Sequence, residues 1–411
     1  MYIADAKQGM NMVFRVGYIR NRYPEIRNII DKCSTNHQYV KIGKLRQVAL
    51  SLVRAIEIIA GYVVRCRFNM NNDLHAIYKP LSKPKVDVIH TFNTVCETTV
   101  PWISTFETMI PRTNCLCCRD WETSTLTPDS LTIHGFELLA EDNCKALLAL
   151  SESNKNIQLQ IMDALNIEYR HAIADKIKVL PPPQSLLITP EELKKKFSGV
   201  HKCVEFIFIG GLFYRKGGAQ ILDAMEDMVA KGMKLHLTIV SALIDDGFTK
   251  ITEPEKEHYE KMIAEKEWIT HFPKLPNAQV LELCKQAHIG LLPSMADTYG
   301  YSVLEMQAAG CPVITTDIRA LGEINNNKCG YVINVPQYPS TEAIYDIPGS
   351  MATLKEVIYR GMHDALTDIQ NNPDNIAQRA LFAYSRIDSE HSPERYAERL
   401  ADIYHQANMQ Y

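Results

Sequence analysis

The chain has 411 residues, of which 46% are hydrophobic and 22% charged, an ordinary globular composition unlike that of a collagen or a disordered polymer. At roughly 150 residues per domain, this length predicts two domains or three small ones. Forty-four basic and 48 acidic side chains give a net charge of −4, which argues against the broad basic surface of a nucleic-acid-binding protein. Residues 1–130 are net basic and the remainder net acidic. This basic part either faces an anionic acceptor or a membrane, or is a solvated surface.

The sequence also indicates the cellular compartment in which the protein is expected. The opening MYIADAKQGM lacks the pattern of a signal peptide, and no stretch reaches the roughly 18 uninterrupted apolar residues of a membrane-spanning helix. Eleven cysteines, most of them in apolar runs, are typical of reduced, buried thiols. We therefore expect a cytoplasmic protein. The stretch from Val48 to Val64 predicts an amphipathic helix, which either packs in the core or contacts the inner face of a membrane or a lipid-linked acceptor.

The first half of the chain predicts an α/β domain. Its candidate strands are Asp87–Thr91, Trp102–Thr105, Ala146–Leu150 and Ile177–Leu180. The run Pro181–Pro183 and the polar stretch that follows it through Lys196 indicate an interdomain linker.

From Val204 onward, short β-branched runs alternate with amphipathic stretches, which is typical of a parallel sheet wound by crossover helices. The expected strands are Val204–Ile209, Leu235–Val240, Trp268–His271, Ile289–Leu292, Val313–Thr315 and Tyr331–Asn334. The expected helices are Gly217–Lys231, Glu253–Lys266, Ala278–Gln286, Ser302–Ala309, Met351–Asn371, Ile376–Ser385 and Ser392–Gln410. We expect an N-terminal domain over 1–190, a C-terminal domain over 191–385 and a last helical segment over 386–411.

The segment after the expected strand Ile289–Leu292 carries the strongest chemical signal. Ligands of doubly wound sheets bind beyond the carboxyl ends of the strands. Gly300, Tyr301 and Ser302 stand where a helix is expected to begin, so their amides would face a bound diphosphate. Asp297 and Glu305 bracket this turn, and carboxylates accept hydrogen bonds from paired sugar hydroxyls. The alternative is a surface aspartate and an ordinary acidic residue near a helix N-terminus.

The run from Asp297 to Glu305, followed by Cys311-Pro-Val-Ile and by Glu323, resembles the donor-site signature of retaining glycosyltransferases of family 4. That resemblance implies the GT-B fold, with two Rossmann-like domains and a C-terminal helix that crosses back to the N-terminal domain. It also implies that Glu305 binds the nucleotide ribose and that Asp297 meets the donor sugar. The family has glutamate at both places, whereas this chain has aspartate at the first.

A second similarity lies in the run from Phe208 to Gly218, where Lys216 takes the place of the family's diphosphate-binding lysine. Such a lysine stabilises the charge that develops on the leaving diphosphate. Gly211 stands where the family usually has an arginine, and Arg215 either replaces that arginine or, with Lys216, forms an exposed pair at the start of the next helix.

In the first domain, Glu107 takes the place of a histidine that similar family members carry at a strand end. It is a base, a sugar ligand or a structural carboxylate paired with Arg112. His90 either contributes to the site or is a hydrogen-bonded histidine of a strand end. In the second domain, Ser241 and Leu275 follow strands where the family reads the base of the nucleotide.

The cluster Cys115, Cys117 and Cys118, with His134 downstream, lacks the two spaced ligand pairs of a structural zinc site, so we expect no metal. The Gly-x-Gly-x-x-Gly dinucleotide pattern is also missing, and GT-B enzymes as a class need no metal for catalysis. The sequence and the resemblance together predict a metal-independent retaining glycosyltransferase without a cofactor. It would move a sugar from a nucleotide sugar to a growing polysaccharide, a lipid-linked sugar or another glycan. The alternatives are a catalytically silent nucleotide-sugar-binding protein and a GT-B nucleotide-sugar epimerase.

Overall fold

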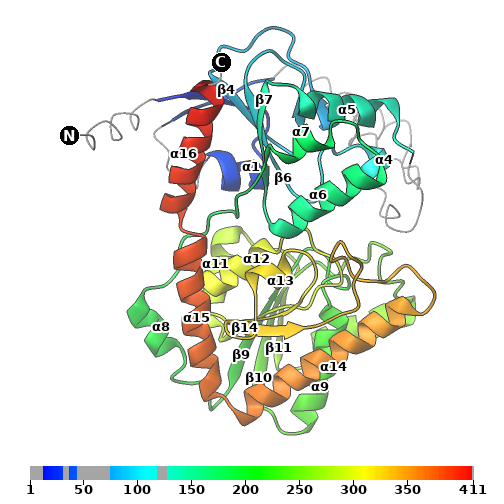
Figure 1. Cartoon of the computed structure of the whole chain (residues 1–411). Helices are drawn as coiled ribbons and strands as arrows, with labels where there is room; N and C mark the ends of the chain where they lie inside the picture. Colours follow the sequence, from blue (N-terminus) through cyan, green and yellow to red (C-terminus); the bar gives the residue numbers. More distant parts are fainter. Residues whose placement is uncertain (1–12, 31–36, 44–74, 118–126, 410–411) are drawn as a thin grey trace. The chain divides into compact units, whose positions relative to one another are not determined.

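The computed structural model describes residues 13–30, 37–43, 75–117 and 127–409. The chain divides into two compact units (Figure 1). The N-terminal unit comprises residues 1–183 and 393–411, and the C-terminal unit comprises residues 184–392. These limits lie close to the boundaries expected at 190 and 386. The amphipathic helix expected from Val48 to Val64 lies outside the described residues.

The N-terminal unit is built on a parallel sheet whose described strands have the order β2-β1-β4-β6-β7-β8. These strands are β1 (Arg15–Tyr18), β2 (Gln38–Lys41), β4 (Val88–Phe92), β6 (Trp102–Phe106), β7 (Cys144–Ala149) and β8 (Ile177–Val179). A separate pair is formed by β3 (Ile77–Tyr78) and β5 (Val95–Cys96). The four strands expected from the sequence are present, and β1 and β2 add to them.

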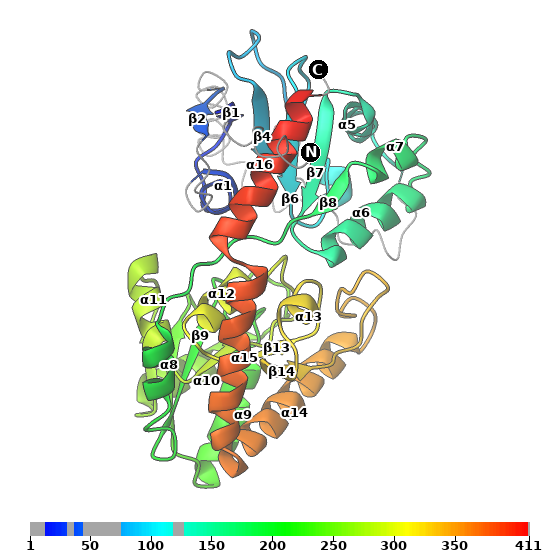
Figure 2. The same ribbon diagram turned by 60° about the vertical axis from the view of Figure 1, so that its left-hand side comes forward.

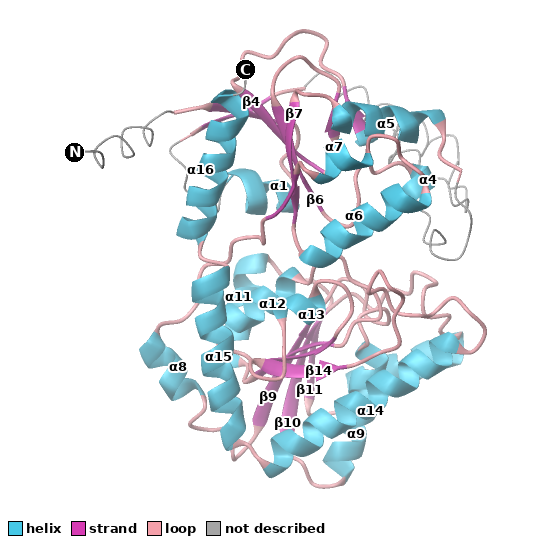
Figure 3. Ribbon diagram, in the orientation of Figure 1, coloured by secondary structure: helices cyan, strands magenta, loops and turns pink. Residues whose placement is uncertain are grey.

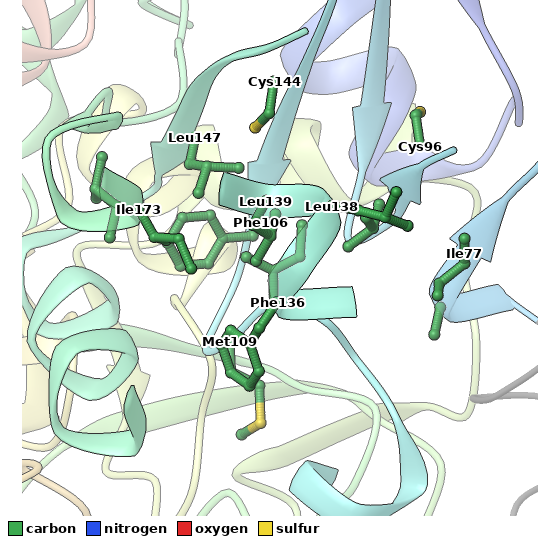
Figure 4. Close-up of a cluster of buried hydrophobic side chains, with 14 of the residues drawn as sticks. Ile77, Cys96, Phe106, Met109, Phe136, Leu138, Leu139, Cys144, Leu147 and Ile173 are labelled. Carbon is green, nitrogen blue, oxygen red and sulfur yellow. The ribbon is translucent and has the colours of Figure 1, made fainter. Parts of the chain in front are cut away.

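Two apolar clusters cover the two faces of this sheet, because side chains alternate along a strand. Trp102 and Phe106 of β6 belong to one cluster, whereas Ile103 belongs to the other. The first cluster includes side chains of α5 and α7 (Figure 4). The described helical segments of this unit are α1 (Tyr23–Glu25), the π-helix η2 (Ile26–Ile30), α4 (Asn114–Cys117), α5 (Ser130–Ala140), α6 (Glu152–Ala164), α7 (Arg170–Ala174) and α16 (Pro393–Met409).

The second cluster is closed by α16, which lies across the sheet (Figure 2). Tyr396, Leu400 and Tyr404 of this helix pack with Val88 and Ile103 of the strands. The last helix of the described chain therefore completes the core of the N-terminal unit, as the predicted fold requires.

The C-terminal unit contains a second parallel sheet, with the described strand order β11-β10-β9-β12-β13-β14. The strands are β9 (Val204–Ile209), β10 (Leu235–Val240), β11 (Ile269–Phe272), β12 (Ile289–Leu292), β13 (Val313–Thr316) and β14 (Gly330–Ile333). Its helices are α8 (Pro190–Lys196), α9 (Gly218–Ala230), α10 (Glu253–Glu265), α11 (Asn277–Gln286), α12 (Tyr301–Ala308), α13 (Leu321–Ile324), α14 (Ser350–Asn371) and α15 (Asp374–Glu390).

Helices flank this sheet, with α9 packed beside α14 and α12 beside α15 (Figure 3). The two parallel α/β units confirm the predicted fold class. Among the residues that the structure describes, no helix combines the length and apolarity needed to cross a bilayer.

Candidate functional site

The strand order of the C-terminal unit places a topological switch point between β9 and β12. From β9, the chain proceeds outward to β10 and β11 on one side, and to β12, β13 and β14 on the other. The loops that leave β9 and β12 at their carboxyl ends therefore diverge, and ligands of doubly wound sheets bind in the crevice at such a point. Residues 210–217 follow β9, and residues 293–300 follow β12.

These two loops are in direct contact. The backbone N–H of Met295 donates to the carbonyl of Arg215 at 2.9 Å. Gly217 has a φ of +82°, and a Cβ atom added there would lie 2.3 Å from the Pro293 carbonyl oxygen. Glycine is required at this position both by the left-handed backbone and by the close approach of the second loop.

Lys216 reaches across to the β12 loop. Its Nζ donates to Asp297 Oδ2 at 2.7 Å and to the Ala296 carbonyl at 3.0 Å, and the two side chains are only 16% and 12% exposed. The same carboxylate accepts a hydrogen bond from the Tyr299 N–H through Oδ1 at 3.3 Å. The structure thus brings together Lys216 and Asp297, which are far apart in the sequence.

Helix α12 begins directly after this loop. Its N-cap, Gly300, has a φ of +91°, and an added Cβ would lie 2.5 Å from Leu321 Cδ2. Ser302 Oγ donates to the carbonyl of Ile209, the last residue of β9, at 3.4 Å. The first turn of α12, with Tyr301 and Ser302, therefore stands at the end of β9, where the helix dipole favours an anion.

Glu305 lies on the next turn of α12 and is only 5% exposed. It is flanked by Leu304 and Met306, which are fully buried. A carboxylate at this depth needs polar partners to offset its desolvation.

Arg215 points elsewhere. It forms an ion pair with Asp246, in the loop after β10, and its guanidinium carbon lies 4.9 Å from the centroid of the Phe248 ring. Around Gly211, a Cβ atom would meet nothing within 4 Å. The place of the absent family arginine is therefore open space, and in this structure the guanidinium of Arg215 is held at the β10 loop by Asp246.

Ser241 and Leu275 follow the ends of β10 and β11, at the same edge of the sheet. Ser241 is buried, and its carbonyl accepts a hydrogen bond from His271 Nε2 at 2.8 Å. Leu275 is half-buried in the loop before α11. Both residues lie at the carboxyl edge of the sheet, on the β10 side of the switch point.

In the N-terminal unit, Glu107 follows β6 and is 17% exposed. It accepts hydrogen bonds from Arg112 Nη1 at 2.9 Å and from Asn93 Nδ2 at 3.2 Å, and its N–H donates to Asn93 Oδ1 at 2.9 Å. The pairing with Arg112 is the structural arrangement that the sequence left open. From the sequence, Asn93 was recognised only as the last residue of the strand-end run that begins at His90, and no role was predicted for it.

His90 lies in the interior of the N-terminal unit, with no exposed surface. Its Nδ1 is 2.7 Å from the Tyr404 hydroxyl, and its Nε2 is 2.8 Å from Thr105 Oγ1. Burial lowers the pKa of His90 to about 3, so the ring is neutral at physiological pH. These contacts favour the structural alternative for His90, because both ring nitrogens already have partners inside the fold.

Among the described residues, no group of three or more His, Cys, Asp or Glu side chains is arranged to hold a metal ion. Cys115 Sγ contacts the Thr127 carbonyl at 3.6 Å, and His134 lies beside Glu137 and Glu97. Cys118 is outside the described residues.

Arg319 is a further polar residue at this edge, and sequence reasoning missed it. It lies in the turn after β13, and its Nη1 donates to the Asp297 carbonyl at 3.3 Å. The carboxyl end of β13 was predicted within one residue, so the rule that ligands gather at strand ends could have drawn attention to Arg319.

Sequence comparisons relate part of this chain to known glycosyltransferases. Residues 190–344 match the family model of glycosyl transferases group 1, a segment that contains both loops and α12. D-inositol 3-phosphate glycosyltransferase of Paenarthrobacter aurescens (strain TC1) is 24% identical over 200 residues, which cover 46% of this chain and 48% of that protein. Glycogen synthase of Mycobacterium tuberculosis (strain H37Rv) is also 24% identical over 200 residues, covering 49% and 42%. The chain thus spans about half the length of these curated relatives.

Solved structures extend the likeness to both units. A glycosyltransferase from Rickettsia africae ESF-5 has a TM-score of 0.56 at 14% identity, covering 96% of this chain and 98% of that one. HepE from Anabaena, in complex with UDP and glucose, has a TM-score of 0.55 at 12% identity, covering 95% and 98%. Sucrose-phosphate synthase from Thermosynechococcus elongatus has a TM-score of 0.52 at 14% identity, covering 90% and 80%. The fold is GT-B.

Proposed function

We propose that this protein is a retaining glycosyltransferase that moves a sugar from a nucleotide-sugar donor to a glycan or lipid-linked acceptor. The contact of Lys216 with the Asp297 loop, directly before the N-terminus of α12, is the observation that carries the proposal. It places a cation and a helix N-terminus side by side, as the binding of a diphosphate requires. The family match over these residues and the complex of HepE with UDP and glucose support the same conclusion.

In this proposal Lys216 acts on the leaving group. The bond between the sugar C1 and the diphosphate oxygen breaks, and the negative charge that develops on the diphosphate is stabilised by the ammonium and by the α12 dipole. The acceptor hydroxyl bonds to C1 on the same face of the sugar, and its proton passes to the leaving phosphate oxygen. These groups supply the positive charge that a divalent ion would otherwise provide, so the reaction proceeds without a metal.

In this proposal two carboxylates, those of Asp297 and Glu305, bind the two sugar rings of the donor. Asp297, at the start of the turn, accepts hydrogen bonds from the transferred sugar, and Glu305, one helical turn into α12, accepts them from the ribose. In the structure the ammonium of Lys216 is paired with Asp297. When the donor binds, its diphosphate draws the ammonium away from this carboxylate, which is then free to accept hydrogen bonds from the sugar. Both side chains are largely shielded from water, so their electrostatic interactions with the bound donor are stronger than they would be in bulk water.

In this proposal the acceptor binds to the N-terminal unit. The net basic character of residues 1–130 suits an acceptor that carries phosphate, and it also suits peripheral contact with an anionic membrane.

The test is to incubate the full chain with UDP-, ADP- and GDP-sugars in the presence of EDTA, with and without lipid-phosphate and oligosaccharide acceptors, and to measure released nucleoside diphosphate. We expect acceptor-dependent release with one base, and a product linkage of the same anomeric configuration as the donor by NMR. Binding without turnover across the panel would favour the silent nucleotide-sugar-binding alternative. Loss of activity in EDTA that manganese restores would contradict the metal-independent reaction, and conversion of the free donor sugar to its epimer would indicate an epimerase.

A further inference from the structure

The turn after β13 contains a residue in a conformation that its side chain disfavours. Arg319 has a φ of +44°, in the left-handed region that glycine adopts readily and that residues with a Cβ rarely enter. Such conformations persist where the surrounding contacts determine them, and they gather at functional sites. The conformation of Arg319 is therefore held by its contacts with neighbouring segments.

The backbone and side chain of Arg319 join three segments of the C-terminal unit. Its N–H donates to the Thr341 carbonyl at 3.0 Å, and its Nη2 forms an ion pair with Glu342. Its Nη1 donates to the carbonyl of Asp297 at 3.3 Å. The turn after β13 is thus tied both to the segment that follows β14 and to the loop that follows β12.

The segment that follows β14 is held by its own backbone hydrogen bonds. Gln337 and Ala343 form an antiparallel bridge, and the Tyr338 N–H donates to the Glu342 carbonyl at 2.8 Å. Thr341, the acceptor of the Arg319 N–H, also has a positive φ, of +65°. The Arg319 and Glu342 side chains are 9% and 17% exposed. This ion pair is therefore shielded from solvent and anchored to a fixed backbone, unlike an exposed pair of long side chains.

In the loop that follows β12, Arg319 contacts Asp297, the residue that holds Lys216. Arg319 contacts the Asp297 backbone, and Asp297 Oδ2 accepts the Lys216 ammonium at 2.7 Å. We infer that Arg319, anchored by Glu342, is a positioning residue that fixes the Asp297 loop and thereby the end of the donor site that receives the transferred sugar. This inference rests on the proposed function and deepens it, because it assigns the recognition of the sugar, as distinct from the nucleotide, to the contact of Arg319 with the Asp297 backbone.

The chemistry of arginine suits this task. Its planar guanidinium presents several N–H donors at fixed angles, so one side chain bonds a carboxylate and a carbonyl together. Lysine offers a compact ammonium on a flexible stem and does not reproduce that geometry. Loss of the guanidinium frees the Asp297 carbonyl from its anchor, while Gly300 and α12 keep their own contacts.

The test compares Arg319→Gly with Arg319→Ala and Glu342→Gln in the full chain. Both Arg319 variants lose the guanidinium, but only glycine also relieves the left-handed backbone, so Arg319→Gly remains informative if Arg319→Ala is unstable. Arg360→Ala is the matched control, because Arg360 forms an exposed ion pair with Glu356 in the same unit. Two quantities are measured: hydrogen exchange of residues 295–299, and the affinities for a nucleoside diphosphate and for its sugar conjugate. The probe pairs are UDP with UDP-glucose, ADP with ADP-glucose and GDP with GDP-mannose.

In Arg319→Gly and Glu342→Gln we expect faster exchange at residues 295–299, about tenfold weaker binding of the sugar conjugate, and a change of less than about twofold for the nucleoside diphosphate. Unchanged exchange in Arg319→Gly, or equal weakening of both ligands, would overturn the assignment. If the wild-type chain binds none of these nucleotides, the proposed function fails, and the exchange data still decide whether Arg319 fixes the loop.

Discussion

Lys216 illustrates how a single residue acquires a role from its surroundings. Its ammonium is held by a carboxylate and a backbone carbonyl of another loop, at the start of a helix. In water a lysine side chain samples many rotamers, and fixing one costs conformational entropy. Here that cost is offset by two hydrogen bonds in a largely shielded position, so the ammonium is already held beside the start of α12 before a donor draws it to the diphosphate.

Lys216→Ala is expected to lower kcat by about 10²- to 10³-fold, as removal of one group that stabilises a developing charge typically does. Donor KM is expected to change much less, because the charge on the diphosphate increases in the transition state. Steady-state kinetics with the active nucleotide sugar measure both. The control is Lys202→Ala, which removes an exposed lysine of the same unit. A normal kcat in Lys216→Ala would remove Lys216 from the leaving group.

Glu305→Gln is expected to weaken nucleoside diphosphate binding by about tenfold, because a charged acceptor for ribose hydroxyls is replaced by a neutral one. Calorimetry with the nucleoside diphosphate alone measures this effect without the donor sugar. Glu282→Gln, at a carboxylate exposed on α11, serves as the matched control. Affinity equal to that of the wild type would exclude the ribose role.

At the scale of secondary-structure elements, the position of the first turn of α12 depends on the backbone conformation of Gly300. Gly300 combines a left-handed φ with a close approach to Leu321, so the direction in which the helix leaves the β12 loop depends on the absence of a Cβ. Gly211, in the other loop, has open space around it. The two glycines therefore make a matched pair.

Gly300→Ala is expected to destabilise the protein by about 1–3 kcal/mol, through backbone strain and through displacement of Leu321. Because the helix start is displaced, nucleoside diphosphate binding is expected to weaken as well. Thermal unfolding and calorimetry measure the two effects. Gly211→Ala is expected to leave stability within about 0.5 kcal/mol of the wild type. Equal stability of the two variants would contradict the account of α12.

The elements of the C-terminal unit were predictable because its strands are short apolar runs bounded by turn residues. Strands β9, β10 and β12 have the predicted bounds. β1 and β2 escaped notice because neither is a buried apolar run: β1 begins with an exposed arginine and contains a glycine, and β2 is a half-buried edge strand that begins and ends with a polar residue. Short edge strands carry little apolar signal.

The site was predictable only in part. The rule that ligands bind at strand ends pointed to Asp297, whereas Lys216 was singled out by its resemblance to the family's diphosphate-binding lysine. The contact between them depends on the strand order, which the sequence does not display. The surroundings of His90 depend on a hydroxyl from the last helix, far away in the chain. The ion pair that holds Arg215 could not be foreseen either, because Asp246 lies in a loop without regular periodicity.

At the scale of the whole molecule, the contact between His90 and Tyr404 joins a central strand of the N-terminal unit to α16. The buried ring is uncharged in the folded protein, since its pKa is lowered to about 3. An unfolded chain exposes the histidine, whose pKa then returns to about 6.5. Below pH 6.5 the unfolded state therefore binds a proton that the folded state does not.

The free energy of unfolding is accordingly expected to fall as the pH drops below about 6.5, with a contribution from His90 of at most about 1.4 kcal/mol per pH unit. His90→Gln is expected to be less stable at neutral pH but to lose less stability between about pH 7 and pH 5 than the wild type. Urea unfolding at the two pH values measures both slopes. His171→Gln, at an exposed histidine of the same unit, should retain the wild-type slope. Equal slopes for His90→Gln and the wild type would contradict the neutral, buried ring.

The packing of α16 on the first sheet has a consequence for synthesis on the ribosome. The strands β4, β6 and β7 are translated before residues 184–392, but side chains that cover one of their faces come from α16. Residues 184–392 form a contiguous unit and can fold as soon as they leave the exit tunnel. The sheet of the N-terminal unit is thus translated before residues 184–392 but is covered only after them, and until then one of its apolar faces stays exposed.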